Sequence, residues 1–170
     1  MGTLSEPHRL TDTDIREGFC SGAQELDDWL TKYAKQNQRA NNAITYVTTL
    51  NDRVIGYYAI CSAGVSKERV PVGFASKRPR DIPCILLARL AVDSRAQGRK
   101  VGRQLLRDAI VRACQAAESI GAACLLVHCR DDEAKAFYMH QLDFLESPVD
   151  SLHLILPMDQ ARGLIIKPTS

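Results

Sequence analysis

The sequence lacks the features that define several large classes of protein. No apolar run approaches the roughly 20 residues that a membrane-spanning helix needs, and no apolar stretch follows a basic start as in a secretory signal. Internal repeats and low-complexity tracts are missing as well. Hydrophobic residues make up 45% and charged residues 25%, which are the proportions of a folded chain. The 170 residues therefore predict one soluble domain, residues 1–170.

Cysteine and histidine show no pattern of a disulfide framework or a metal centre. The six cysteines form no Cys-x-x-Cys pair, and Cys61, Cys84 and Cys124 lie in apolar, β-rich stretches where a free thiol packs as a small hydrophobe. The four histidines show no ligand spacing. We therefore expect no metal and a reducing, cytoplasmic location.

The first strong pattern is a stripe of apolar residues at helical spacing. It predicts a helix over about residues 22–39, with Ser21 and Gln24 as a capping box at its start. The stripe consists of Leu26, Trp29, Leu30 and Tyr33. β-branched and aromatic residues then predict a hairpin of residues 44–50 and 54–60.

The rest of the chain alternates apolar strands with helices. Residues 63–82 hold glycines, prolines and five basic residues, which predict a long basic loop. The later elements are a central strand at 83–92, a helix from Val101 ended by Gly121, a strand at 123–128, a short helix from Asp131 to about Leu142, and strands at 144–146 and 152–156. On the helix from Val101 the apolar stripe is Val101, Leu105, Ala109, Ala113, Ala117 and Ile120. This order predicts an α/β domain with a mixed sheet.

The net charge of +2 conceals an uneven distribution along the chain. Residues 67–112 carry twelve Lys and Arg against four Asp and Glu, a balance of +8, whereas residues 1–66 have −2 and residues 113–170 have −4. A basic block between acidic ends indicates a polyanionic partner. A solvated basic surface is the alternative.

The turn between the central strand and the next helix carries the strongest chemical signal. A glycine-bearing turn that opens a helix offers backbone N–H groups without intrahelical partners, and Arg99, Lys100 and Arg103 add positive charge. The turn contains neither G-x-G-x-x-G nor G-x-x-x-x-G-K-[ST]. We interpret it as an anion site, with an ordinary strand-to-helix connection as the alternative.

These residues resemble a known family. Arg89-Leu90-Ala91-Val92-Asp93, followed by Gln97-Gly98-Arg99-Lys100-Val101-Gly102, resembles motif A of the GNAT N-acetyltransferases, whose usual form is Q/R-x-x-G-x-G/A. Lys100 stands at the family's middle glycine. Glu133-Ala134-Lys135-Ala136-Phe137-Tyr138, with Leu142-Asp143-Phe144 after it, resembles motif B, with Asp143 in place of the usual glycine.

A narrower likeness covers almost the whole chain. It rests on Gly22 with Leu26-Asp27-Asp28-Trp29-Leu30, Gly56-Tyr57-Tyr58, Ile82-Pro83, Leu87-Ala88-Arg89-Leu90-Ala91-Val92-Asp93 and Glu133-Ala134-Lys135. In these segments the chain is similar to the GNAT toxins of bacterial toxin–antitoxin modules, which acetylate the α-amino group of aminoacyl-tRNA and stop translation.

The resemblance implies a fold, a co-substrate and site residues. It implies a GNAT-like mixed, mostly antiparallel sheet flanked by helices, with a splayed central strand pair that holds acetyl-CoA. It places the acetyl-CoA contacts at Leu90, Ala91, Val92, Gln97, Gly98, Arg99, Lys100, Val101, Gly102 and Arg103. Tyr138 matches the tyrosine that protonates the departing sulfur, and a core aromatic is the alternative for it. The resemblance further implies a ribbon-helix-helix antitoxin and a homodimer.

The chemistry of the acceptor favours an aminoacyl ester. The strand segments offer no evident general base, and a lysine amine with a pKa near 10 would need one, whereas an α-amino group has a pKa near 8. The basic residues then serve tRNA phosphates, and we assign this role to Lys77, Arg78, Arg80, Lys32, Lys35 and Arg39. Two alternatives remain: a GNAT enzyme for a small-molecule or protein amine, and a non-catalytic GNAT module, for which Lys100 is the best argument.

Overall fold

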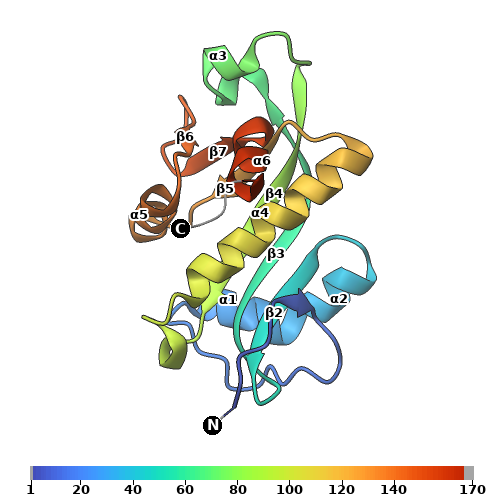
Figure 1. The fold of residues 1–170 in the computed structure, drawn as a ribbon, viewed down its shortest axis with the longest axis vertical. Coiled ribbons are helices and arrows are strands. Elements are labelled where there is room, and N and C mark those ends of the chain that lie inside the picture. Colours follow the sequence, from blue (N-terminus) through green and yellow to red (C-terminus); the bar gives the residue numbers. More distant parts are fainter. Residues whose placement is uncertain (1, 167–170) are drawn as a thin grey trace. The chain divides into compact units, whose positions relative to one another are not determined.

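A mixed seven-stranded sheet forms the framework of the protein (Figure 1). The computed structural model describes residues 2–166. The strands are β1 (His8–Arg9), β2 (Ile44–Leu50), β3 (Arg53–Ser66), β4 (Asp81–Val92), β5 (Cys124–His128), β6 (Leu145–Glu146) and β7 (His153–Pro157). Their order in the sheet is β1-β2-β3-β4-β5-β7-β6. β4 and β5 run parallel, whereas β1–β2, β2–β3, β5–β7 and β6–β7 are antiparallel, so the predicted fold class is confirmed.

The described residues form two compact units that interleave in the sequence. The first unit comprises residues 2–61 and 88–109, and the second comprises residues 62–87 and 110–166. β3, β4 and the helix α4 (Val101–Ile120) contribute residues to both units. The core of the first unit gathers around Trp29, Leu30 and Tyr57, and the core of the second gathers around Ile82, Cys124 and Ile155.

The N-terminal helix is interrupted by a π-helical turn, which the sequence did not predict. α1 (Gln24–Asp28) continues through the π-helical η1 (Trp29–Tyr33) into α2 (Ala34–Arg39), which lies beside β2 (Figure 1). The wider π turn rotates the apolar stripe, because each π turn takes in one residue more than an α turn. Ala34 is therefore fully buried, whereas Tyr33, the last residue of the predicted apolar stripe, is 50% exposed and does not share the buried face of Trp29 and Leu30.

The predicted capping box at this helix was also wrong. Ala23 is the N-cap residue, and no side chain caps it. The Ser21 hydroxyl donates instead to the Asp27 carboxylate at 2.7 Å, and the Gln24 amide donates to Asp28 at 2.9 Å. Asp27 is buried and accepts this bond, while the Ser21 hydroxyl oxygen accepts from the Ala23 N–H at 3.1 Å, one residue before the helix begins.

The hairpin is confirmed, whereas the long loop after it is not. β2 and β3 pair from Ile44 with Ile60 to Leu50 with Arg53. β3 continues to Ser66, and β4 begins at Asp81. Between them lie the 3-10 turn η2 (Lys67–Arg69) and the short helix α3 (Val72–Ala75), so regular structure occupies most of the segment that was predicted to be a loop.

The predicted helix and strands of the C-terminal half are confirmed. α4 ends at Ile120, and Gly121 follows with a φ of +76°, a left-handed conformation that glycine adopts without strain. The predicted apolar stripe of α4 is buried as far as Ala117, whereas its last residue, Ile120, is 69% exposed. Asp131 caps α5 (Asp132–Gln141) by accepting from the Ala134 N–H. The strand β1 and the helix α6 (Met158–Ile166) were not predicted.

The pairing of β4 with β5 is limited to one end of β4. It joins Cys84–Leu87 to Cys124–Val127, and β4 then continues to Val92. All six cysteines are free, as predicted. Among the described residues, no helix has both the length and the hydropathy to cross a lipid bilayer.

Candidate active site

The turn between β4 and α4 has the backbone of an anion site. It runs through the 3-10 turn η3 (Ser94–Ala96) to the first residue of α4, Val101. Gly98 has a φ of +84°, and Lys100 has a φ of +63°. Lys100 therefore occupies the left-handed region that a glycine adopts freely, at the position where motif A usually has glycine. The backbone takes the glycine conformation although the residue is lysine.

A buried carboxylate anchors the start of this turn. Asp93 has no exposed surface and accepts hydrogen bonds from the Cys20 N–H at 3.0 Å and from the Arg95 N–H at 2.9 Å. The Arg95 guanidinium donates to both carboxylate oxygens at 2.9 Å. These bonds, that of the Arg95 side chain first, lower the pKa of Asp93 to about 2 although burial opposes the shift. Asp93 is therefore ionised at neutral pH, and it fixes the segment around Cys20 to the turn.

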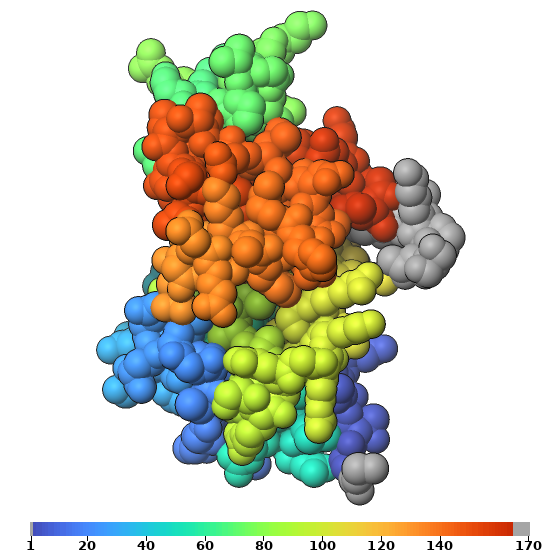
Figure 2. Space-filling model, turned by 90° about the vertical axis from the view of Figure 1, so that its left-hand side faces the viewer, coloured from blue at the N-terminus to red at the C-terminus, as the bar shows by residue number. Residues whose placement is uncertain are grey.

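The cations of the turn are available to a ligand. Arg99, Lys100 and Arg103 are exposed, and none forms an ion pair with a carboxylate of residues 2–166. Figure 2 shows the yellow-green segment around this turn at the surface of the molecule. The Gln97 amide behaves differently, because it donates to the Ser21 and Val92 carbonyls at 3.2 Å and so closes the turn. An anion bound here would meet free α4 N–H groups and three cations.

The strand that precedes the turn leaves backbone groups for a ligand. Leu90 and Val92 are half-buried, and Ala91 is buried against the core of the first unit. They lie beyond Leu87, where the pairing of β4 with β5 ends. The sequence prediction placed the extended arm of the co-substrate along these residues, and an unpaired strand edge is able to accept it.

Tyr138 lies in the second unit, on the inner face of α5. It is 6% exposed and packs edge-on against Phe137 and Phe144, with ring centroids 5.2 and 6.0 Å away. Burial raises the pKa of Tyr138, so its hydroxyl stays protonated across the physiological range. In the part of the chain that the structure describes, no group hydrogen-bonds this hydroxyl. Tyr138 is therefore both a core aromatic and a free O–H donor.

The structure distinguishes two kinds of predicted tRNA-binding cation. In the first unit, Lys32 pairs with Asp28 at 3.4 Å, and Asp12 pairs with Lys35 at 3.0 Å and with Arg39 at 3.8 Å. Carboxylates thus partly neutralise all three of these cations, which weakens their attraction for a polyanion.

The three predicted tRNA-binding cations of the second unit have no such carboxylate partners among residues 2–166. Lys77 and Arg80 make no ion pair within residues 2–166. Arg78 donates to the Phe74 carbonyl at 2.8 Å and stacks on the Phe74 ring, 4.2 Å from its centroid. The Lys67 N–H donates to the Arg80 carbonyl at 3.1 Å and ties the two ends of this segment together. These three cations fit a polyanion better than those of α2 and η1 do.

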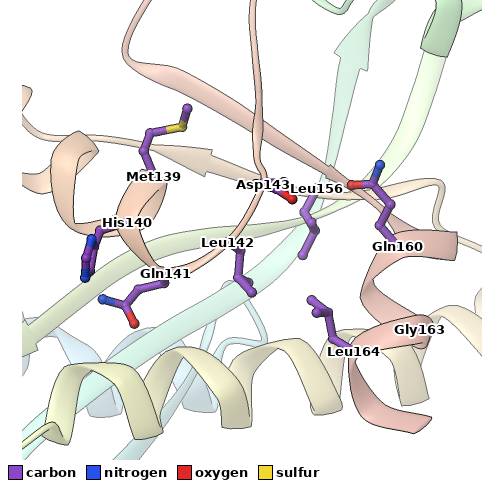
Figure 3. Close-up of a pocket in the computed structure, with 9 residues that line it drawn as sticks. All are labelled: Met139, His140, Gln141, Leu142, Asp143, Leu156, Gln160, Gly163 and Leu164. Carbon is purple, nitrogen blue, oxygen red and sulfur yellow. The ribbon is translucent and has the colours of Figure 1, made fainter. Parts of the chain in front are cut away.

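A cavity and a pair of histidines were missed by the sequence analysis. The cavity, of about 600 Å³, lies between the end of α5 and α6. In Figure 3, Leu142, Leu156 and Leu164 are among the side chains around it. His128 and His153 stack at 3.9 Å between ring centroids, because they are direct partners across β5 and β7. The described residues contain no group of three His, Cys, Asp or Glu able to hold a metal.

The sequence analysis also missed the environment of Arg89. Its guanidinium lies over the Trp29 ring, 4.5 Å from the ring centroid, in the first unit. The only available signal was the position of Arg89 within the strand that leads to the turn, and that signal does not indicate a partner.

A family model and a relative of known type match most of this chain. The model of the acetyltransferase (GNAT) domain matches residues 41–144. A tRNA-acetylating toxin of Mycobacterium tuberculosis is 47% identical over 165 residues, which cover 97% of this chain and 99% of the relative.

Two solved structures share the fold. The structure of AtaT complexed with acetyl-methionyl-tRNAfMet superposes with a TM-score of 0.87 at 26% identity. The match covers 96% of this chain and 99% of the AtaT chain. A tyrosine-to-phenylalanine variant of the AtaT toxin, bound to the C-terminus of the antitoxin AtaR and to acetyl-CoA, has a TM-score of 0.82 at 24% identity. The match covers 97% of this chain and 99% of that one.

Proposed function

Since this chain belongs to the GNAT acetyltransferase family, we propose that it transfers the acetyl group of acetyl-CoA to the α-amino group of an aminoacyl-tRNA and thereby blocks translation. The observation that carries the proposal is the turn before α4. There, a left-handed backbone and three cations without ion pairs among residues 2–166 follow a strand whose pairing with β5 has ended. The tRNA-acetylating relative, similar along nearly the whole chain, supports the acceptor.

The co-substrate is proposed to bind along β4 and at the start of α4. Its pyrophosphate would be held by the free N–H groups of the α4 N-terminus and by Arg99, Lys100 and Arg103, and its pantetheine arm by the backbone of Leu90–Val92. Gln97, Gly98, Val101 and Gly102 complete the proposed contact set. Gln97 would act through its backbone and by shaping the turn, because its amide already bonds two carbonyls.

Tyr138 is proposed to protonate the departing sulfur. The α-amino nitrogen attacks the thioester carbon, the carbon–sulfur bond breaks, and the tyrosine O–H supplies the proton that makes the thiol. A raised pKa suits this role, because Tyr138 then remains an acid at every pH of interest. The acceptor amine, with a pKa near 8 or below, loses its own proton to water.

The proposed partners follow from the charge and from the relatives. Lys77, Arg78 and Arg80 are proposed to contact tRNA phosphates, with Lys32, Lys35 and Arg39 in a weaker role because of their ion pairs. As a toxin, the protein would be neutralised by an antitoxin of the ribbon-helix-helix type and would form a homodimer. The free cysteines fit a cytoplasmic location, and we propose one GNAT domain over residues 1–170.

Transfer of labelled acetyl groups tests the proposal. Purified protein is incubated with labelled acetyl-CoA and either charged or uncharged bulk tRNA, a polyamine or a lysine peptide. We expect label on charged tRNA alone, because uncharged tRNA offers no α-amino group. Label on the polyamine or peptide, with none on charged tRNA, would show a GNAT enzyme for another amine.

Lys100 allows a separate test of the non-catalytic alternative. We expect acetyl-CoA to bind the natural protein, because Gly98 and the α4 N-terminus remain. In a calorimetric titration, Lys100→Gly should bind it no more tightly, because the variant loses one of the three cations of the turn. Tight binding to Lys100→Gly without binding to the natural protein would mean that Lys100 has disabled the site.

A further inference from the structure

Arg89 is a half-buried cation of β4. It projects from β4, immediately before Leu90–Val92, and its guanidinium lies 4.5 Å from the centroid of the Trp29 ring. Within residues 2–166, no carboxylate forms an ion pair with it. Arginines that are partly buried usually have a carboxylate partner, because an unpaired charge is costly to bury. The cation–π contact with Trp29 offsets only part of the cost of burying this charge. The guanidinium is therefore still able to bind an anion.

The platform under Arg89 is rigid. The Trp29 ring is nearly parallel to the Tyr57 ring, with an angle of 10° and 6.0 Å between centroids. The Tyr57 hydroxyl donates to the Leu26 carbonyl at 2.7 Å, and Phe19 packs edge-on against Tyr57 at 5.6 Å. The aromatic stack therefore orients the guanidinium before any ligand arrives, which lowers the entropy cost of ligand binding.

The helix that supplies Trp29 has an irregularity of the kind found at functional sites. Trp29 is the first residue of the π-helical turn η1, and such turns are frequent where a helix has a functional role. The same turn exposes Tyr33 to 50%, although a regular helix would have buried this ring. An exposed tyrosine and an orientated, unpaired arginine in one unit are the side chains with which proteins bind single-stranded nucleic acid.

We propose that Arg89 binds a phosphodiester of the single-stranded 3′ end of the charged tRNA. This assignment rests on the proposed function. Residues two apart on a strand point to the same face, so Arg89 presents its charge on the face of β4 that also carries Ala91, next to the backbone edge proposed to hold the pantetheine. The acceptor end would thus be held beside the strand that presents the thioester. A guanidinium suits this role because its planar donors match the phosphate oxygens in pairs.

Trp29 is the only tryptophan of the chain, so its fluorescence reports directly on this site. The probe is a CCA trinucleotide without a terminal phosphate, compared with the same trinucleotide carrying uncharged methylphosphonate linkages. We expect the charged probe to change Trp29 emission and the uncharged probe to have little effect. Arg89→Gln should remove the response, and Arg89→Lys should keep a weaker one. An equal response of Arg89→Gln to the charged probe would overturn the assignment.

Kinetics with charged tRNA provide the second test. In Arg89→Gln we expect the KM for charged tRNA to rise about 10-fold or more, which is the effect expected when one charged hydrogen bond to the substrate is removed. The kcat should change little. The slope of log affinity for charged tRNA against log salt concentration should become shallower by about 0.7, the value for one phosphate of a single strand. Affinity for acetyl-CoA should stay unchanged.

Arg53→Gln is the matched control for the removal of one positive charge. It replaces an arginine of the same unit, whose guanidinium donates to the Glu17 carbonyl and to no other group of residues 2–166, and it should behave as the natural protein. If the natural protein acetylates charged tRNA and Arg89→Gln has the same KM and salt dependence, the assignment of Arg89 is wrong while the proposed function stands. If the natural protein ignores charged tRNA, the proposed function is wrong, and the fluorescence titration still decides whether Arg89 binds the phosphodiester.

Discussion

Tyr138 combines burial with a free hydroxyl, a combination that separates its structural role from its chemical one. Its ring packs against Phe137 and Phe144, and this packing does not need the hydroxyl. We expect Tyr138→Phe to fold with the stability of the natural protein and to bind acetyl-CoA, but to lose about 10²–10⁴-fold in kcat, the usual contribution of a positioned acid. Unfolding curves and single-turnover rates measure the two effects separately. Unchanged turnover in the variant would leave Tyr138 as a core aromatic only.

Asp93 is expected to link stability to pH. Its pKa of about 2 lies below the value near 3.9 of an unfolded aspartate, so ionised Asp93 stabilises the fold above about pH 4. This contribution, about 2–3 kcal/mol, is lost as the pH falls from about 4 through 2. Asp93→Asn should therefore be less stable than the natural protein at pH 7, and the difference should shrink in this acid range.

The measurement is urea unfolding at a series of pH values, followed by Trp29 fluorescence. Because Asp93 also fixes the turn before α4, the KM for acetyl-CoA should rise in Asp93→Asn. Equal stability of the two proteins at pH 7, or a difference that does not change with acid, would refute the assigned role.

Among the elements, β3 and α4 approach each other at a glycine. A Cβ added at Gly56 would lie 2.9 Å from Leu105 Cδ1 and 3.0 Å from Val101 Cγ1. Gly56→Ala should therefore destabilise the protein by about 1–3 kcal/mol through overpacking. It should also weaken acetyl-CoA binding, because Val101 is the first residue of α4 and moves with the helix start.

Gly73→Ala is the control, because a Cβ at Gly73 meets no atom within 4 Å. Its stability and its acetyl-CoA affinity should match those of the natural protein. If Gly56→Ala unfolds at the same urea concentration as this control, the close approach of β3 and α4 has no energetic consequence.

The elements also show what could be predicted from the sequence. β-Branched and aromatic residues located β2, continuous apolar runs located the largely buried β4 and β5, and helical spacing located α4. The π turn η1 escaped prediction, because no local signal marks the extra residue that turns Tyr33 to the solvent. The segment before β4 was predicted as a loop, since its glycines and prolines hid the extension of β3.

The candidate site was predictable only where a motif carried it. The glycines and cations marked the turn before α4, but the left-handed backbone of Lys100 and the buried bonds of Asp93 depend on tertiary packing. The contact of Arg89 with Trp29 joins residues far apart in sequence. Sequence spacing contains no information on such a pair.

At the scale of the whole molecule, the basic block of residues 67–112 is the feature that a polyanion would recognise. Replacing Lys77, Arg78 and Arg80 together by Ala should weaken the use of charged tRNA. The slope of log tRNA affinity against log salt concentration should also become shallower, by up to about 0.9 for each tRNA phosphate that these side chains no longer neutralise. Affinity for acetyl-CoA should barely change, because its phosphates are assigned to the turn before α4.

The control for total charge replaces Arg9, Arg53 and Arg162 by Ala, which removes the same charge from outside the basic block. It should use charged tRNA as the natural protein does. Should the triple variant of Lys77, Arg78 and Arg80 acetylate charged tRNA at natural rates across a salt titration, these cations do not contact tRNA.

The central claim is that the acetyl group is transferred to the α-amino group of an amino acid carried by tRNA. The most direct measurement is mass spectrometry of nuclease-digested charged tRNA after incubation with acetyl-CoA and either the natural protein or Tyr138→Phe. With the natural protein, we predict aminoacyl-adenosine that is heavier by one acetyl group, and this group lies on the α-nitrogen. With Tyr138→Phe, we predict almost no acetylated product. Two results would contradict the claim. One is unmodified aminoacyl-adenosine after prolonged incubation with folded protein that binds acetyl-CoA, and the other is an acetyl group on a tRNA base.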